Sequence, residues 1–111
     1  MVDGPTAPPF IYVVPFLTAG NSATFSFSGA VPLSSTYLLY SLNGAGPTNT
    51  IVGPLDLSNP IKVMRELTAD RLGNGSVALV VPLAASGRTL YTQAATLPAG
   101  QVSNSFAMPV N

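Results

Sequence analysis

Residues 22–28 read Ser-Ala-Thr-Phe-Ser-Phe-Ser, in which apolar and small polar side chains alternate. Successive side chains of a β-strand point to opposite faces, so Phe25 and Phe27 share one face and hydroxyl groups occupy the other. The large apolar residues decide which face is covered, so the aromatic face is expected to lie on a core. The stretch predicts a β-strand and sets the fold class that the rest of the chain has to match.

Strand-like stretches continue on both sides of this one. They are separated by turn sequences such as Asn43-Gly44-Ala45-Gly46-Pro47, where glycine supplies positive φ and proline stops pairing. Asn74-Gly75 is the strongest hairpin signal of the chain. Further strands are expected at residues 10–14, 36–42, 51–52, 55–57, 76–81, 88–95 and 102–110. Seven to nine short strands at this spacing predict an all-β fold, an Ig-like antiparallel β-sandwich.

Residues 60–70 allow two interpretations. Asn59-Pro60 offers an N-cap and a first-turn proline, which is a legitimate start for a short helix. Ile61, Val63 and Leu67 also fit the period of two that a strand requires. The strands expected on both sides favour extended structure, and a short helix is the alternative.

A chain of 111 residues has the size of one domain. The proline-rich residues 1–9 predict an extended N-terminal arm, and residues 10–111 predict a single β-sandwich domain. No apolar run approaches the roughly 18 residues that a membrane-spanning helix needs. The N-terminus also lacks the basic and apolar segments of a signal peptide.

Charge is scarce in this chain, where 4 Lys and Arg residues balance 4 Asp and Glu residues. The absence of His and Cys excludes a Ser-His-Asp triad, a thiolate nucleophile, a disulfide and an ordinary structural zinc site. With a net charge of zero, the chain lacks the excess of basic residues that nucleic-acid binding requires. A net charge of zero also weakens the repulsion that keeps copies of a soluble protein apart. The charges that cluster in one stretch are Lys62, Arg65, Glu66, Asp70 and Arg71.

Three carboxylates, Asp56, Glu66 and Asp70, are the candidates for hydrolytic chemistry outside the N-terminal arm. Each lies in or beside a predicted turn, where such residues cap backbone groups or face water. Residues 70–75 resemble the start of an EF-hand loop, but Leu72 and Val81 stand where calcium ligands are needed. We therefore expect no enzyme activity, no cofactor and no metal site.

The tyrosines keep carbohydrate binding open as an alternative. Tyr12, Tyr37, Tyr40 and Tyr91 could form a platform on which sugar rings stack, although strand alternation would place several of them in the core. Asn74-Gly75-Ser76 also has the form of an N-glycosylation acceptor.

The N-terminal stretch carries apolar side chains in both strand phases, so both of its faces need cover. Edge strands usually carry protective charge, but no charged residue occurs between Asp3 and Asp56. Strand addition to a neighbouring subunit, or packing against it, would supply the cover. The alternative is an ordinary first strand between the two sheets. The candidate inter-subunit contact residues are Phe10, Ile11, Tyr12, Val13, Val14, Phe16 and Leu17.

Several stretches resemble a β-rich module that is common in secreted proteins of Planctomycetes and related bacteria. The most specific pieces are Gly87-Arg88-Thr89 and Gln93-Ala94. The other matching stretches are residues 18–29, 39–44, 68–70, 73–75, 81–83 and 102–105. The resemblance implies an Ig-like extracellular sandwich, usually C-terminal in a larger exported protein, and it implies no catalytic residue.

Together these observations predict a structural, self-associating subunit of an extracellular assembly, such as a filament, a tube or a surface layer. Residues 1–17 are the expected connector, and the expected partners are other copies of the same chain. The expected location is the cell exterior or the cell surface, with the signal peptide absent from this chain. The alternative is an extracellular carbohydrate-binding or accessory module of a larger secreted protein, with polysaccharide as its partner. Neither a nucleic-acid partner nor a membrane span is expected.

Overall fold

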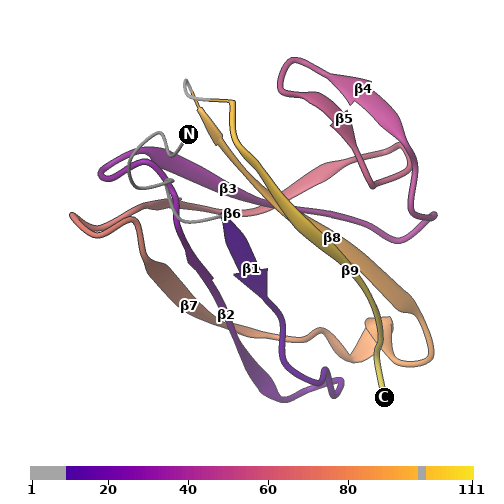
Figure 1. Ribbon diagram of the computed structural model, residues 1–111. Coiled ribbons are helices and arrows are strands. Elements are labelled where there is room, and N and C mark those ends of the chain that lie inside the picture. Colours follow the sequence, from indigo (N-terminus) through magenta and orange to yellow (C-terminus); the bar gives the residue numbers. More distant parts are fainter. Residues whose placement is uncertain (1–9, 98–99) are drawn as a thin grey trace, which may run out of the picture.

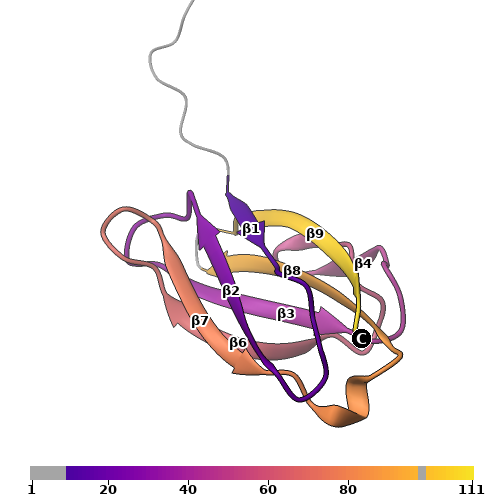
Figure 2. The same cartoon turned by 90° about the horizontal axis from the view of Figure 1, so that it is seen from below.

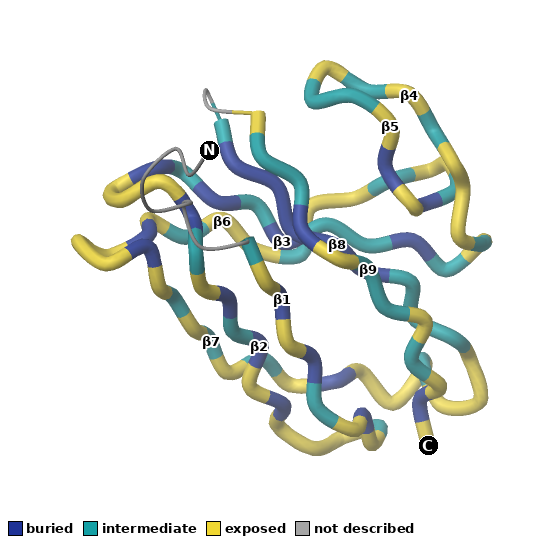
Figure 3. The backbone as a smooth tube through the Cα atoms, viewed as in Figure 1, coloured by how far each residue is buried: buried dark blue, intermediate teal, exposed yellow. Residues whose placement is uncertain are grey.

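β2 (Ser22–Ser28) has the alternating burial that its sequence predicts. Ala23, Phe25 and Phe27 are buried, and the hydroxyl-bearing side chains between them are exposed or half-buried (Figure 3). The computed structural model describes residues 10–97 and 100–111, so the predicted arm at residues 1–9 lies outside the described residues. Within these ranges the chain forms nine strands and one short helix.

Two antiparallel sheets form the layers of the fold (Figures 1 and 2). The three-stranded sheet contains, in spatial order, β1 (Ile11–Val13), β2 and β7 (Gly75–Val80). The four-stranded sheet contains β6 (Lys62–Thr68), β3 (Ser35–Ser41), β8 (Thr89–Leu97) and β9 (Val102–Pro109). A hairpin of β4 (Thr48–Thr50) and β5 (Gly53–Leu55) stands away from the three-stranded sheet (Figure 1).

The chain crosses between the two sheets after β2, after β6 and after β7, as it does in Ig-like sandwiches. The predicted all-β antiparallel sandwich is therefore confirmed. Its core lies between the sheets, where alternate side chains of both layers meet. The buried core residues are Tyr12, Val14, Leu17, Ala23, Phe25, Phe27, Ala30, Leu38, Ala69, Val81, Ala94 and Val110.

Residues 62–68 form strand β6, so the extended interpretation of residues 60–70 is confirmed and the short helix is wrong. The strand forms because β3 offers it a hydrogen-bonding edge along its whole length. The short helix of the described residues lies elsewhere: a 3₁₀ turn, η1 (Leu83–Ala85), connects β7 and β8.

The prediction of a hairpin at Asn74-Gly75 is wrong, because β6 and β7 belong to different sheets. The loop between them is organised by Asp70, whose carboxylate accepts the N–H groups of Leu72 and Asn74 at 2.8 Å each. The bonds from Asn74 and then Leu72 hold the pKa of the Asp70 carboxyl below its ordinary value. Gly75 is required by packing, since a Cβ at this position would overlap the Phe27 ring.

Ile51 and Val52 form a turn rather than the predicted strand. The strands that flank the turn pair Thr48–Thr50 with Gly53–Leu55. The Thr50 hydroxyl closes the turn by donating to the Gly53 carbonyl at 2.8 Å and accepting the Val52 N–H at 3.2 Å. This local pairing leaves Ile51 exposed at the hairpin tip. The described residues contain no helix long and apolar enough to cross a membrane.

Candidate functional site: two sheet edges and an apolar cavity

Part of the N-terminal stretch belongs to the protein's own core. Tyr12, Val14 and Leu17 are buried, and Tyr12 is 0% exposed. Phe10 is half-buried, with its ring edge-on to the Phe27 ring at a centroid distance of 6.0 Å. These four candidate contact residues therefore pack against other residues of the same chain.

The outer face of the same stretch is apolar and faces solvent. Ile11 and Val13 are 42% and 51% exposed, and Phe16 is 89% exposed. We call these three residues the N-terminal patch. Of the candidate contact residues, they are the ones with a side chain free to touch another molecule.

The outer edge of β1 is closed by a side chain from the other sheet. Asn104 of β9 accepts the Tyr12 N–H through Oδ1 at 2.8 Å and donates its Nδ2–H to the Tyr12 carbonyl at 2.9 Å. Asn104 reaches β1 because the pairing of β9 with β8 shifts register between Gln93 and Ala95, as in a β-bulge. At Tyr12 both backbone groups that a neighbouring strand would need are already bonded.

The Tyr12 hydroxyl strengthens the same junction between the sheets. It shares a buried hydrogen bond of 2.9 Å with Oγ1 of Thr92 on β8. Burial raises the pKa of Tyr12 to about 12, an effect that the Thr92 hydrogen bond partly opposes. β1 is therefore fixed to the opposite sheet by its backbone and by its central side chain.

The outer edge of β7 is open. Val81 N–H bonds to the Asn21 carbonyl at 2.9 Å, so the alternation of an antiparallel pair directs odd-numbered residues toward β2. The N–H and C=O groups of Ser76, Ala78 and Val80 consequently point to the other edge. No strand of the described residues pairs there.

The sequence of β7 also carries none of the charges or prolines that usually protect an edge strand. It reads Gly-Ser-Val-Ala-Leu-Val, without charge or proline, and its pairing with β2 has no register shift. Val80 is 68% exposed beside this edge. The outer edge of β7 is thus a ready template for another strand.

β6, the neighbouring outer strand of the other sheet, is protected. It carries Lys62, Arg65 and Glu66, all exposed. Its pairing with β3 shifts register beside Leu38, which leaves one extra residue in β6 and bends the edge. Charge and bulge together oppose the addition of a further strand.

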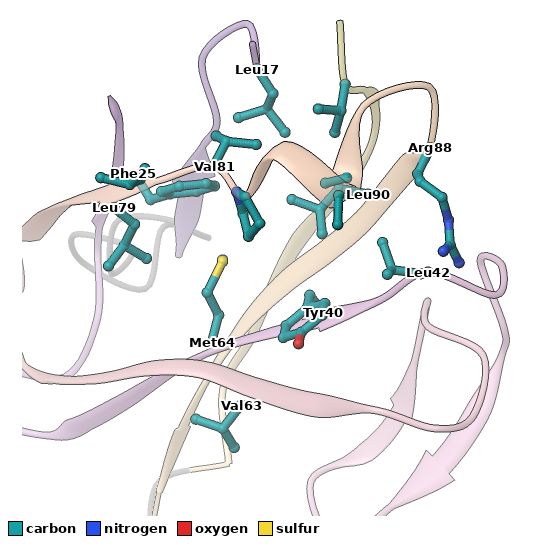
Figure 4. Close-up of a pocket in the computed structure, with 15 residues that line it drawn as sticks. Leu17, Phe25, Tyr40, Leu42, Val63, Met64, Leu79, Val81, Arg88 and Leu90 are labelled. Carbon is teal, nitrogen blue, oxygen red and sulfur yellow. The ribbon is translucent and has the colours of Figure 1, made fainter. Parts of the chain in front are cut away.

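A cavity of about 510 Å³ lies between the sheets on the side where β6 and β7 are the outer strands (Figure 4). The three-stranded sheet and its connections contribute Leu17, Phe25, Leu79 and Val81 to its wall. The four-stranded sheet contributes side chains from the opposite side, and η1 closes one end. These further lining residues include Tyr40, Leu42, Val63, Met64, Ala84, Ala85 and Leu90.

A smaller, polar recess of about 210 Å³ lies next to the cavity. Tyr40, Leu42 and Arg88 line both spaces, so the recess adjoins the cavity. Lys62 and Arg88 supply two positive charges to the recess, and no carboxylate is among its described lining residues. The combined space is apolar inside and cationic at its mouth.

The candidate carboxylates do not converge. Asp56 accepts a hydrogen bond from the Ser105 hydroxyl at 2.9 Å, Glu66 lies on β6, and Asp70 organises the loop before β7. No group of three potential metal ligands occurs in the part of the chain that the structure describes.

The four tyrosines do not form one exposed row. Tyr12 is buried, Tyr40 lines the cavity, and Tyr37 and Tyr91 are half-buried on β3 and β8. The predicted placement of several tyrosines in the core applies to Tyr12, whose hydroxyl is satisfied by Thr92.

Sequence reasoning missed the open edge of β7 and the cavity. One signal for the edge was present, because no charged residue occurs between Arg71 and Arg88. The cavity left no local signal, since its walls come from segments far apart in the chain. Comparisons with family models, with curated proteins and with solved structures each gave no match for this chain.

Proposed function

We propose that this chain is a non-catalytic structural subunit that associates with copies of itself outside the cell by pairing the outer edges of β7. The open edge of β7 is the observation that carries the proposal. The scarcity of charge supports it, because little repulsion opposes the approach of two copies.

The β7 edge suits antiparallel pairing with a second copy about a two-fold axis. An axis at Ala78 places Ser76 opposite Val80 of the partner subunit, so the outward N–H and C=O groups face one another. The three outward residues of each copy then exchange backbone hydrogen bonds, each contributing about 0.5–1.5 kcal/mol net. A two-fold contact is complete in a dimer.

The N-terminal patch supplies the second contact that growth beyond a dimer requires. Ile11 and Val13 lie on β1, at the opposite edge of the sheet from β7, and Phe16 follows them. Burial of such apolar side chains contributes about 25 cal/mol per Å² removed from water. Alternation of a β7 contact with a contact through the N-terminal patch would extend the assembly.

The test is sedimentation of the full chain over a range of concentrations. Ala78→Lys places a lysine opposite its own copy at the axis, and we expect the dissociation constant to rise at least tenfold. Thr24→Lys is the matched control, because Thr24 lies opposite Ala78 on the central strand and is also exposed. Equal loss of association in both variants, or a wild-type chain that stays monomeric throughout, contradicts the proposal.

A separate variant tests the second contact. Phe16→Ser removes the aromatic and most exposed side chain of the N-terminal patch without touching the core. We expect this variant to stop at dimers when the wild type grows further, as seen by negative-stain electron microscopy. Unchanged growth would exclude the N-terminal patch as a connector.

A further inference from the structure

We infer that the cavity between the sheets is a binding site for a straight-chain fatty acid, with the alkyl chain between the sheets and the carboxylate at Lys62 and Arg88. This site is separate from the strand-pairing edge of the proposed function. It follows from the shape, lining and charge of the cavity and its recess.

The interior of the cavity suits an alkyl chain. Leu79 and Val81 of one layer face Met64 and Leu90 of the other across the open space (Figure 4). Water in such a space finds few hydrogen-bonding partners, and an empty space deprives its walls of dispersion contacts. The volume of about 510 Å³ lies within the range of about 300–1,000 Å³ that small-molecule sites span.

The mouth of the cavity selects an anion. Lys62 and Arg88 are half of the 4 basic residues of the chain, and they line one recess without a carboxylate among its described lining residues. An arginine guanidinium binds a carboxylate with two parallel hydrogen bonds, which fixes the orientation of the head group. A cationic or uncharged head group lacks this interaction.

The lining also favours one flexible, unbranched chain. Met64 has three rotatable bonds and adapts to an irregular neighbour. Tyr40 and Leu42 line both the apolar space and the recess, so they lie where an alkyl chain would meet its head group. A single carboxylate ligand can therefore occupy both spaces, with its head group in the recess and its chain inside.

The first test is calorimetric titration with octanoate, decanoate and dodecanoate below their micelle concentrations. We expect one site per chain and an affinity that rises about fourfold for each added methylene while the cavity has room. Decyltrimethylammonium has an alkyl chain one carbon longer than that of decanoate but a cationic head group, and we expect it not to bind. Comparable affinity for this cation, or no saturable binding of any carboxylate, would overturn the inference.

Charge variants locate the head group. Arg88 is exposed, so Arg88→Gln should fold normally, and we expect it to weaken decanoate binding at least tenfold. Arg71→Gln makes the same charge change in the loop before β7 and should leave binding unchanged. Equal affinities of the two variants would overturn the assignment of Arg88.

Methyl NMR locates the chain independently of any variant. The Met64 methyl group lines the cavity, whereas Met108 is not among the lining residues. Decanoate should shift the Met64 methyl resonance at saturation and leave that of Met108 nearly unchanged. A saturable shift confined to Met108 would place the ligand elsewhere and overturn the inference.

Discussion

β1 and β7 are the two outer strands of the same three-stranded sheet, and the backbone groups at their outer edges are bonded to different extents. β1 has only three residues, and Asn104 bonds both outward backbone groups of its central residue, Tyr12. β7 has six residues, carries no charge and directs three residues' backbone groups to an edge at which no strand of residues 10–97 or 100–111 pairs. The difference teaches that an apolar strand becomes a candidate for association through its free backbone rather than through hydrophobicity alone.

The largest expected difference between the two edges is in the contribution of their side chains to stability. Tyr12→Ala removes a fully buried ring and its hydrogen bond to Thr92, and we expect a loss of about 3–5 kcal/mol. Val80→Ala changes a largely exposed side chain, and we expect a change within about 0.5 kcal/mol. Urea unfolding at low protein concentration measures both values, and similar losses would remove the contrast between the strands.

Alkaline pH should weaken the β1 junction selectively. Tyr12 has a pKa of about 12 in the fold against 10.0 for an ordinary tyrosine, so the unfolded chain loses this proton first as the pH rises. The free energy of unfolding should therefore be unaffected by Tyr12 below pH 10 and fall by about 2–3 kcal/mol between pH 10 and pH 12. Tyr12→Phe removes this titration, and an equally steep fall in the variant would contradict the assignment to Tyr12.

Removing the side chain that closes β1 should cost less. Asn104→Ala leaves the N–H and C=O of Tyr12 without their partners, and we expect a loss of about 1–3 kcal/mol. Asn104→Asp keeps the acceptor for the Tyr12 N–H and loses the donor, so its loss should be intermediate. Chemical unfolding orders the three proteins, and a variant Asn104→Ala as stable as the wild type would show that the edge needs no closure.

The smallest effect on stability is expected at β6, whose charged side chains oppose the addition of a further strand at its edge. Arg65→Thr combined with Glu66→Thr keeps the net charge at zero and changes two exposed side chains. We expect stability to change by less than about 0.5 kcal/mol while association becomes stronger, because the edge of β6 loses two of its three charges and keeps only Lys62. Sedimentation of the double variant alongside the wild type would detect the gain, and unchanged association would assign the protection to the bulge.

The elements that could be predicted are those that local patterning determines. The spacing of Phe25 and Phe27 predicts β2 and its buried face. The extended structure expected over residues 60–70 is present as β6, but the bulge puts Val63 and Leu67 on opposite faces, so the expected period of two is wrong. The Asn74-Gly75 signal failed because a dipeptide describes a turn but not the sheet to which the next strand belongs. Packing under the Phe27 ring explains Gly75 instead.

The candidate site was harder to predict, because the order of the strands in each sheet decides which strands are outermost and which residues line a cavity. The apolar phases of residues 10–17 indicated two faces, but the covered face depends on Thr92 and Phe106 of the other sheet, which contact the Tyr12 side chain. The edge depends on Asn104. The charge pattern marked Lys62 and Arg65 as an exposed group, yet only the topology makes β6 and β7 outer strands of their sheets. The cavity depends on both layers at once.

Backbone amide exchange at the two edges tests the central claim most directly. The amides of Ser76, Ala78 and Val80 should exchange fast in dilute protein and become protected as the concentration rises, because a second copy pairs with β7. The Tyr12 amide, bonded to Asn104, should be protected at every concentration. Amides of β7 that exchange equally fast at all concentrations while the chain associates would contradict the account.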